Sequence, residues 1–285
     1  MKHSIKRKLV QVAAFGYSNP YLMNFKGGKL YQGKWKQFCN PGLNCYSCPA
    51  AAFACPIGAL QAVNGSANFK LSFYVVGILL AFGVLLGRAV CGWLCPFGLL
   101  QELIHKIPSP KLKLKKAFLY LKYVVLVVFV IVLPIAVTDY MGMGKPAFCQ
   151  YICPAGTLEG GVPLLLSHQA LRQTIGSLFT LKVAILIGTV IGCVLVYRFF
   201  CKALCPLGAI YGLLNKISIY GLKVDEHKCI NCGKCRQICR MEVDPVRATD
   251  SAECIRCGEC AKACPEGAIC VGFAAEGRKS ERQPL

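Results

Sequence analysis

The 285-residue chain has few charged residues and very few histidines. Charged residues make up 16% of the sequence, against about 25% in soluble domains. Only 13 side chains are acidic and only 4 are histidine. Hydrophobic residues reach 55%, and the mean hydropathy is +0.50. This composition excludes a disordered chain and argues against an ordinary soluble enzyme.

The sequence also lacks the common catalytic fingerprints. It contains no P-loop, no C-x2-C-H haem attachment motif and no flavin fingerprint. His105 and His168 do not pair on long apolar segments, which argues against a b-type haem. Four titratable residues could line a quinone site, although charges at such positions are more often simply solvated: Glu102, Asp139, Glu159 and His105. The sequence therefore gives little support to catalysis.

Three apolar segments are long enough to cross a membrane. Leu71–Gly87 carries no charge, whereas Ala117–Thr138 and Leu178–Tyr197 each hold one lysine near an end, where it can snorkel to the interface. Leu9–Phe25 is also uncharged but is broken at Asn19-Pro20, so the sequence leaves open whether it spans the membrane. It lacks a small-residue cleavage site, and we therefore interpret it as an anchor rather than a removed signal peptide.

The net charge of +20 resides largely in the loops that flank these segments. If residues 9–25 span the membrane, the N-terminus and the 88–116 loop share the more basic face, with 12 basic residues against 7; if they do not span, the counts are 11 against 8. Both counts place the N-terminus inside, so the charge rule leaves open whether residues 9–25 span. No basic helix is interleaved with aromatic residues in the manner of a nucleic-acid binding protein. The expected partner of the positive charge is therefore the anionic lipid of the cytoplasmic leaflet.

The most informative feature is the set of 20 cysteines. Residues 229–264 contain the spacing C-x2-C-x2-C-x3-C twice, as in bacterial two-cluster ferredoxins. Three thiolates on a tight loop hold one face of a cubane, and the fourth cysteine reaches the other cluster. Zinc usually takes two separated C-x2-C pairs, which argues against zinc. The spacing predicts one 4Fe-4S cluster on Cys229, Cys232, Cys235 and Cys264, and a second on Cys254, Cys257, Cys260 and Cys239.

A second motif, C-x3-C-P, occurs at Cys91/Cys95, Cys149/Cys153 and Cys201/Cys205. The ending C-P-x-G also follows Cys55 and Cys264, so the chain carries five copies of an internal repeat. Proline suits the first turn of a helix, and glycine lets the backbone approach a cluster. The runs 97–107 and 207–217 are amphipathic and too short to span, so we expect re-entrant half-helices that point N–H groups at an anionic cluster.

The order of the segments pairs these motifs. Cys91/Cys95 follow the first long apolar segment and Cys201/Cys205 follow the last, so both pairs share a face and are predicted to form one cluster site. Cys149/Cys153 lie on the opposite face, together with the 39–55 loop. That face has six candidate ligands for four places, or else the loop holds a cluster of its own. The candidates from the loop are Cys39, Cys45, Cys48 and Cys55; the remaining cysteines, Cys193 and Cys270, are assigned to packing.

The segments VCGWLCPFG and FFCKALCPLGAIYGLL, followed by the double ferredoxin motif, resemble the NapH-type membrane polyferredoxins, a 4Fe-4S binding family related to the electron-transfer module of NosR. The resemblance covers most of residues 71–273. It implies four spans, both termini and the ferredoxin domain in the cytoplasm, and electron transfer between quinol or another donor and an exported reductase. The chain departs from NapH in the motif at Cys149 and in the 39–55 loop, so the resemblance does not identify the partner.

The sequence thus predicts a mainly α protein in three parts. These are an N-terminal anchor and Cys-rich loop (1–70), a polytopic transmembrane domain with re-entrant half-helices carrying the CxxxCP motifs (71–220), and a C-terminal α+β ferredoxin-like domain with two 4Fe-4S clusters and a tail (221–285). We expect an iron-sulfur carrier in the inner cell membrane, with two or three further clusters near the membrane and a redox protein or quinone as partner. The alternatives are a redox-sensing or metal-centre maturation factor and a quinone-reactive membrane oxidoreductase.

Overall fold

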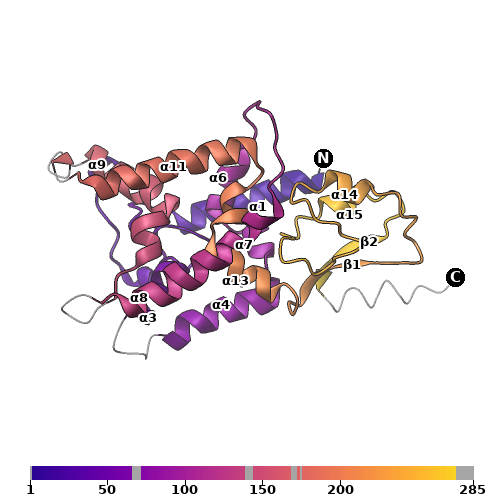
Figure 1. Cartoon of the computed structure of the whole chain (residues 1–285), viewed down its shortest axis with the longest axis horizontal. Coiled ribbons are helices and arrows are strands. Elements are labelled where there is room, and N and C mark those ends of the chain that lie inside the picture. The colour runs from indigo at the N-terminus through magenta and orange to yellow at the C-terminus, as the bar shows by residue number, and fades with distance from the viewer. Residues whose placement is uncertain (1, 66–71, 139–143, 168–171, 174, 274–285) are drawn as a thin grey trace.

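The computed structural model of the chain is mainly helical and describes residues 2–65, 72–138, 144–167, 172–173 and 175–273. Long helices run along the longest axis of the molecule, and a small domain with a two-stranded sheet lies at one end (Figure 1). The long helices are α1 (Lys2–Ser18), α4 (Ser72–Leu86), α7 (Lys116–Val125) with its continuations η3 (Leu126–Val132) and α8 (Leu133–Ala136), and α11 (Ser177–Leu195).

Two of these helical segments are long and apolar enough to cross a hydrocarbon core of about 30 Å. They are Lys116–Ala136, with 21 residues, and Ser177–Leu195, with 19 residues. Both coincide with segments that the sequence predicts as spans. The third predicted span, Leu71–Gly87, corresponds to helix α4, which has only 15 residues. Leu71 itself lies outside the described residues.

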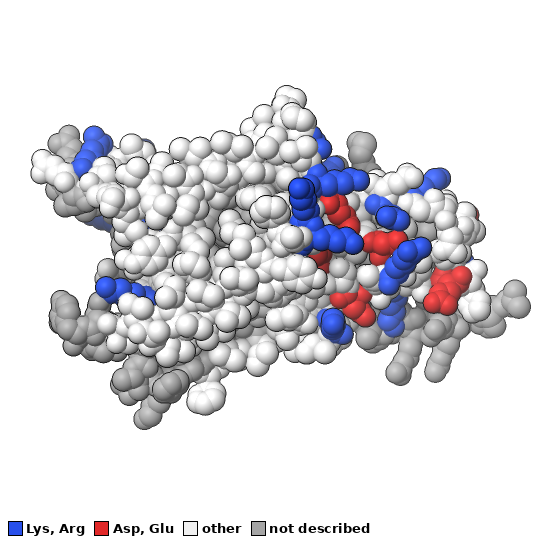
Figure 2. All heavy atoms as spheres, viewed as in Figure 1, with Lys and Arg blue, Asp and Glu red and all other residues white. Residues whose placement is uncertain are grey.

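The outer surface of the helical body is apolar. Only 28% and 11% of the apolar windows of Lys116–Ala136 and Ser177–Leu195 are buried inside the protein. In the view of Figure 2, a broad uncharged belt covers the body, while lysine, arginine, aspartate and glutamate gather at the end formed by the small domain. A large apolar surface between charged ends is the arrangement expected of a protein that faces lipid.

Helix α1 also turns apolar residues outward and polar residues inward. Its inward-facing residues include Arg7 and Gln11, which are buried, whereas Leu9 and Val12 are 63% and 56% exposed. An amphipathic helix of a soluble protein buries its apolar face instead. The helix ends at Ser18, directly before the predicted break at Asn19-Pro20.

Short helices turn the chain back after the long ones. In two places, a short helix carries the first cysteine of a C-x3-C-P motif and the next helix begins at its proline: α5 (Ala89–Trp93) with α6 (Pro96–Ile104), and α12 (Phe199–Ala203) with α13 (Pro206–Leu214). Helix α3 (Pro56–Asn64) starts in the same way after Cys55. The remaining elements of the body are α2 (Asn24–Gly27), η1 (Lys34–Gln37), η4 (Phe148–Ile152), η5 (Gly156–Gly161) and α9 (Val162–Ser167). Re-entry of the half-helices into a membrane stays a prediction.

The small domain has the α+β composition that the cysteine spacing predicts. Strands β1 (Tyr220–Val224) and β2 (Ile269–Phe273) pair antiparallel, and helices α14 (Lys234–Ile238) and α15 (Glu259–Ala263) follow the two cysteine loops. Its buried core contains Leu222, Ile269, Cys235 and Cys260. A second, larger core includes the half-helices and their cysteines and extends to Met241, Val243 and Ile255 of the small domain.

Candidate iron-sulfur sites

The two cysteine loops of the small domain share one backbone conformation. Asn231 and Gly233 have φ of 52° and 72° in the first loop, and Arg256 and Gly258 have φ of 50° and 76° in the second. Left-handed residues at alternate positions curl each loop tightly, which lets backbone N–H groups point to the inside. Glycine adopts this conformation without the steric cost that a side chain brings.

Each of these loops is completed by a cysteine from the other motif. One cavity, the distal site, is lined by Cys229, Cys232, Cys235 and Cys264. A second cavity of about 130 Å³, the docked site, is lined by Cys254, Cys257, Cys260 and Cys239. The structure therefore brings together the two crossed sets of cysteines that the spacing predicts.

The central site is formed where the half-helices α6 and α13 begin. Cys91, Cys95, Cys201 and Cys205 are each 4% exposed. Burial raises the pKa of the Cys95 and Cys205 thiols, and the nearby thiols of Cys201 and Cys91 raise it further. These four cysteines come from the first and the third C-x3-C-P motifs. They are the set that the order of the segments assigns to one face.

Two buried arginine side chains each extend from one half of the central site to the other. Arg88 donates from Nη2 to the carbonyl oxygen of Cys201 at 3.0 Å, and Arg198 donates from Nη1 to the carbonyl oxygen of Cys91 at 2.6 Å. Each arginine precedes its own first cysteine by three residues and contacts the opposite half of the site. Both side chains are fully buried. Sequence reasoning counted them as loop charges, although the repeated spacing R-x2-C-x3-C-P is a signal that could have singled them out.

The terminal site lies toward the other end of the body. A cavity of about 140 Å³ is lined by Cys45, Cys55, Cys149 and Cys153. The other two cysteines of the loop lie outside this lining: Cys48 packs with Ala50 and Ala51, and Cys39 lines a separate apolar cavity. Of the six candidates that the sequence offers for this face, the structure therefore gathers four.

Backbone N–H groups point at cysteine sulfur in both sites of the body. Gly208 and Gly156 donate to Cys205 and Cys153 at 3.4 Å each, and Gly98 and Gly58 occupy the same position after Cys95 and Cys55. Such donors stabilise negative charge on sulfur. The close approach of this glycine to a cluster stays a prediction.

The chemistry of the four sites fits 4Fe-4S clusters. Burial raises the pKa of the Cys55 and Cys95 thiols to about 12, so these residues become thiolate ligands only when iron replaces the proton. Within the part of the chain that the structure describes, no three Cys, His, Asp or Glu side chains converge as ligands of a single metal ion. Four cysteines placed around a cavity are instead the ligands that a multinuclear cluster requires.

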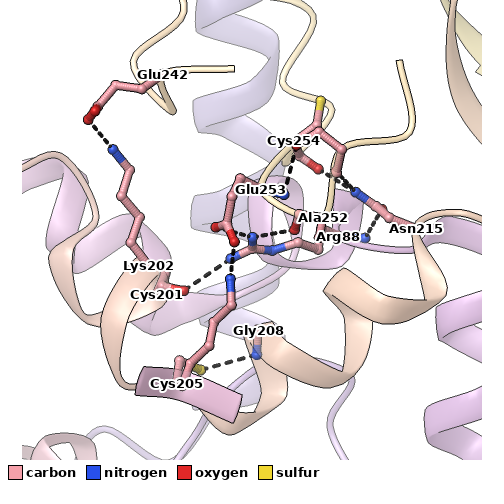
Figure 3. Close-up of polar contacts among 12 residues, drawn as sticks. Arg88, Cys201, Lys202, Cys205, Gly208, Asn215, Glu242, Ala252, Glu253 and Cys254 are labelled. Atoms are coloured by element: carbon pink, nitrogen blue, oxygen red, sulfur yellow. Dashed lines mark hydrogen bonds and ion pairs between the residues drawn. The ribbon is translucent and has the colours of Figure 1, made fainter. Parts of the chain in front are cut away.

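The docked site sits directly against the central site. Arg88 donates to the carbonyl oxygen of Ala252 at 2.6 Å and to Glu253 at 2.8 Å (Figure 3). Lys122 also pairs with Glu253. Lys122 is fully buried here, whereas the sequence predicts that it snorkels to the interface. Asn215 binds the carbonyl oxygen of Cys254 at 2.9 Å. The backbone next to one docked-site ligand is therefore anchored on the arginine that crosses the central site.

A short segment of the N-terminal loop joins the central and terminal sites. A β-carbon added at Gly42 would lie 2.8 Å from the Cα of Cys95 in the central site, and Leu43 and Asn44 line the cavity of the terminal site. The consecutive residues 42–44 therefore touch both sites. Tyr211 further fixes this segment by donating to the carbonyl oxygen of Pro41 at 2.9 Å.

The residues predicted as candidates for a quinone site do not gather in one place. Glu102 pairs with Arg7 at 2.8 Å and with Arg198 at 2.5 Å; burial raises its pKa, but the two arginines outweigh burial and hold it at about 2. His105 contacts the carbonyl oxygen of Cys193. Glu159 accepts from the N–H of Cys45 at the terminal site, and burial raises its pKa to about 7. Asp139, like His168, lies outside the described residues.

Comparison with known sequences identifies the domains. A profile described as a 4Fe-4S binding domain matches residues 71–115, 123–167 and 178–223, and another with the same description matches residues 248–270. Each of the first three matches contains one C-x3-C-P motif, which confirms the internal repeat. No solved structure matches the chain.

Several proteins are similar over most of the chain. Two uncharacterized proteins of Methanocaldococcus jannaschii are 30% and 31% identical to it, over 73% and 76% of its length and 72% and 84% of theirs. The putative electron transport protein YccM of Escherichia coli is 26% identical over 73% of this chain and 56% of its own.

The resemblance to NapH and NosR is confirmed. The ferredoxin-type protein NapH of Haemophilus influenzae is 25% identical over 37% of this chain and 51% of its own. The regulatory protein NosR of Stutzerimonas stutzeri is 28% identical over 59% of this chain and 22% of its own. The chain therefore belongs to this family of ferredoxin-type 4Fe-4S electron transport proteins.

Proposed function

We propose that this protein is a membrane-bound electron carrier that holds four 4Fe-4S clusters in a row. The order is distal, docked, central and terminal, and each cluster is held by the four cysteines that line its site. The observation that carries the proposal is the segment 42–44, which packs against Cys95 of the central site and lines the cavity of the terminal site. Together with Arg88, which contacts both the docked and the central site, this segment connects all four sites.

The clusters supply one-electron chemistry when bound, and the protein supplies their spacing and surroundings. The crossed cysteines Cys239 and Cys264 bind the two sites of the small domain into one unit. Arg88 holds the docked site on the central site. The segment 42–44, which touches Cys95 and lines the terminal cavity, keeps the central and terminal sites adjacent.

The proposed location is the inner cell membrane, with the small domain and the start of α1 in the cytoplasm. The apolar belt and the two long exposed helices support this location, and the charged end with the small domain supports the orientation. The terminal site then lies nearer the outer face, where exposed thiols tend to oxidise. Its ligands Cys55 and Cys153 are 7% and 6% exposed, so the protein itself shields them.

Measuring the clusters tests this proposal. Iron and sulfide analysis of the purified protein, with an EPR-monitored redox titration, is expected to show four clusters; fewer than three would contradict the row. Cys45→Ser is expected to remove the iron of the terminal site only. Cys39→Ser, in the same loop but outside the cavity lining, is the matched control and is expected to keep all iron. Retention of all iron by a Cys149→Ser/Cys153→Ser variant would contradict the terminal site.

A second candidate function, direct reaction with a membrane quinone, is favoured by one apolar cavity. This cavity has a volume of about 580 Å³ and includes Leu94, which lies between two ligands of the central site. Its aromatic lining residues are Tyr17, Trp35, Phe38, Phe53, Tyr74 and Phe82. Reduction of the clusters by a short-chain quinol, added to the isolated protein, would support this function. Blockage of that reduction by Leu94→Trp would place the reaction in the cavity.

A further inference from the structure

Two half-helices carry a glutamine at the same position. The sequences CPIGALQ and CPFGLLQ place Gln61 and Gln101 six residues after Cys55 and Cys95, respectively. Both glutamine side chains are buried, with 0% and 1% exposure. A buried amide must satisfy its donors and its acceptor within the protein, so the partners of these two side chains indicate what they do.

Gln101 reaches across the central site. Its Nε2 donates to the sulfur of Cys201 at 3.0 Å and, within its own helix, to the carbonyl oxygen of Phe97 at 3.4 Å. Its Oε1 accepts from the backbone N–H of Cys201 at 3.4 Å and from the thiol of Cys193 at 3.6 Å. Because the oxygen faces a backbone donor, the amide group has only one orientation, with its N–H toward the ligand sulfur.

Gln61 repeats this arrangement at the terminal site. Its Nε2 donates to the sulfur of Cys149 at 3.2 Å and to the carbonyl oxygen of Ile57 at 3.2 Å. Its Oε1 accepts from the backbone N–H of Phe148 at 2.9 Å. In both sites, the glutamine thus extends from one half of the site to the first cysteine of the opposite half.

The other two half-sites use this position differently. Six residues after Cys205 and Cys153 lie Tyr211 and Glu159. Their polar atoms bind the backbone of the joining segment, at the carbonyl oxygen of Pro41 and at the N–H of Cys45. Each site in the body therefore has one side-chain amide on a ligand sulfur and one side chain that fixes the N-terminal loop.

We propose that Gln61 and Gln101 set the reduction potentials of the terminal and central clusters, each acting on one cluster through its N–H···S hydrogen bond. They are positioning residues and do not themselves react. An N–H donor stabilises the reduced cluster more than the oxidised one, because the reduced cluster puts more negative charge on sulfur, and it therefore raises the potential. This inference rests on the proposed function, since it requires clusters at both sites.

A redox titration of single variants tests the inference. Gln101→Met keeps the length of the side chain and removes the donor. We expect it to lower the potential of the central cluster by about 59 mV, equivalent to a tenfold change in the ratio of oxidised to reduced cluster for a one-electron couple, and to leave the other clusters unchanged. Gln61→Met is expected to lower the potential of a different cluster. Iron content, measured on the same samples, reports separately whether the clusters are present.

Gln11 provides a matched control. It is fully buried, and its Nε2 donates at 3.0 Å to the carbonyl oxygen of Gly92, next to Cys91, without contacting sulfur. Gln11→Met is therefore expected to leave all potentials unchanged. Equal shifts in the Gln11 and Gln101 variants, or no shift in the Gln61 and Gln101 variants, would overturn the inference while leaving the proposed function intact. Loss of iron from both variants would also overturn it, because the amides would then hold the sites together rather than tune them.

Discussion

The segment that joins the central and terminal sites offers a sharp test, because Gly42 lies directly against a cluster ligand. A β-carbon added at Gly42 would lie 2.8 Å from the Cα of Cys95 and 3.2 Å from the carbonyl oxygen of Leu94. Carbon atoms pack at about 3.5–4.0 Å, so Gly42→Ala must displace the segment by about 1 Å. Both neighbours are backbone atoms and cannot rotate away. Overpacking of this kind costs about 1–3 kcal/mol, and the displacement moves the segment away from Cys95.

The expected result is a protein that keeps its iron but conducts poorly between the two sites. The assay uses vesicles that contain the protein, with dithionite outside as the electron donor and trapped ferricyanide inside as the acceptor. We expect Gly42→Ala to slow the reduction of ferricyanide and to lower the unfolding temperature. Gly77→Ala is the matched control, because an added β-carbon there meets nothing within 4 Å. Equal rates for wild type, Gly77→Ala and Gly42→Ala would refute the assignment of this segment as the link.

Two further predictions concern packing around the central site. Gly92→Ala would place a methyl group against the carbonyl oxygen of Ile255, so we expect it to weaken docking of the small domain by about 1–3 kcal/mol. Limited proteolysis is then expected to cut this variant at residues 215–220 faster than a Gly188→Ala control. Glu102→Ala leaves Arg7 and Arg198 buried without their shared carboxylate. We expect the free energy of unfolding to fall by about 3–5 kcal/mol, which a lower unfolding temperature would show. Glu102→Gln is expected to lower it less.

The cysteine spacing predicted much of the site because it encodes local geometry. The loop C-x2-C-x2-C closes on itself through left-handed residues at fixed positions, so the sets on Cys239 and Cys264 follow from sequence alone. The proline of C-x3-C-P likewise marks the start of the nine-residue helices α6 and α13. In each case, neighbouring residues determine the structure.

The order of the segments predicted the pairing of Cys91/Cys95 with Cys201/Cys205, but the sequence could not predict which cysteines of the N-terminal loop join the terminal site or where the basic residues lie. The spacing of the N-terminal loop, C-x5-C-x2-C-x6-C, has no period, and only tertiary contacts separate Cys45 and Cys55 from Cys39 and Cys48. The prediction that the basic residues are loop charges was also wrong for two arginines, because an arginine beside an apolar segment usually faces lipid headgroups or water. Arg88 and Arg198 are instead buried, and their partners Glu253 and Glu102 lie more than 90 residues away in the chain.

Charge distinguishes the two sites of the body and leads to a last prediction. Around the central site, Arg88 and Lys122 share Glu253, and Arg7 and Arg198 share Glu102. Two cations face one carboxylate in each group, so positive charge is in excess there. The terminal site has Glu159 against the backbone of a ligand and Lys182 in the lining of its cavity, so it has one carboxyl group for one cation.

Excess positive charge near a cluster favours its reduced, more negative form and raises its potential. We therefore expect the central cluster to be reduced at a higher potential than the terminal cluster, although both receive one glutamine N–H. The Gln101 and Gln61 variants assign the two EPR signals, and Glu159→Gln is expected to bring the two potentials closer together. Reduction of the terminal cluster at the higher potential would contradict this prediction. The buried ion pairs of Glu253 and Glu102 would then serve only to hold the small domain and helix α1 in place.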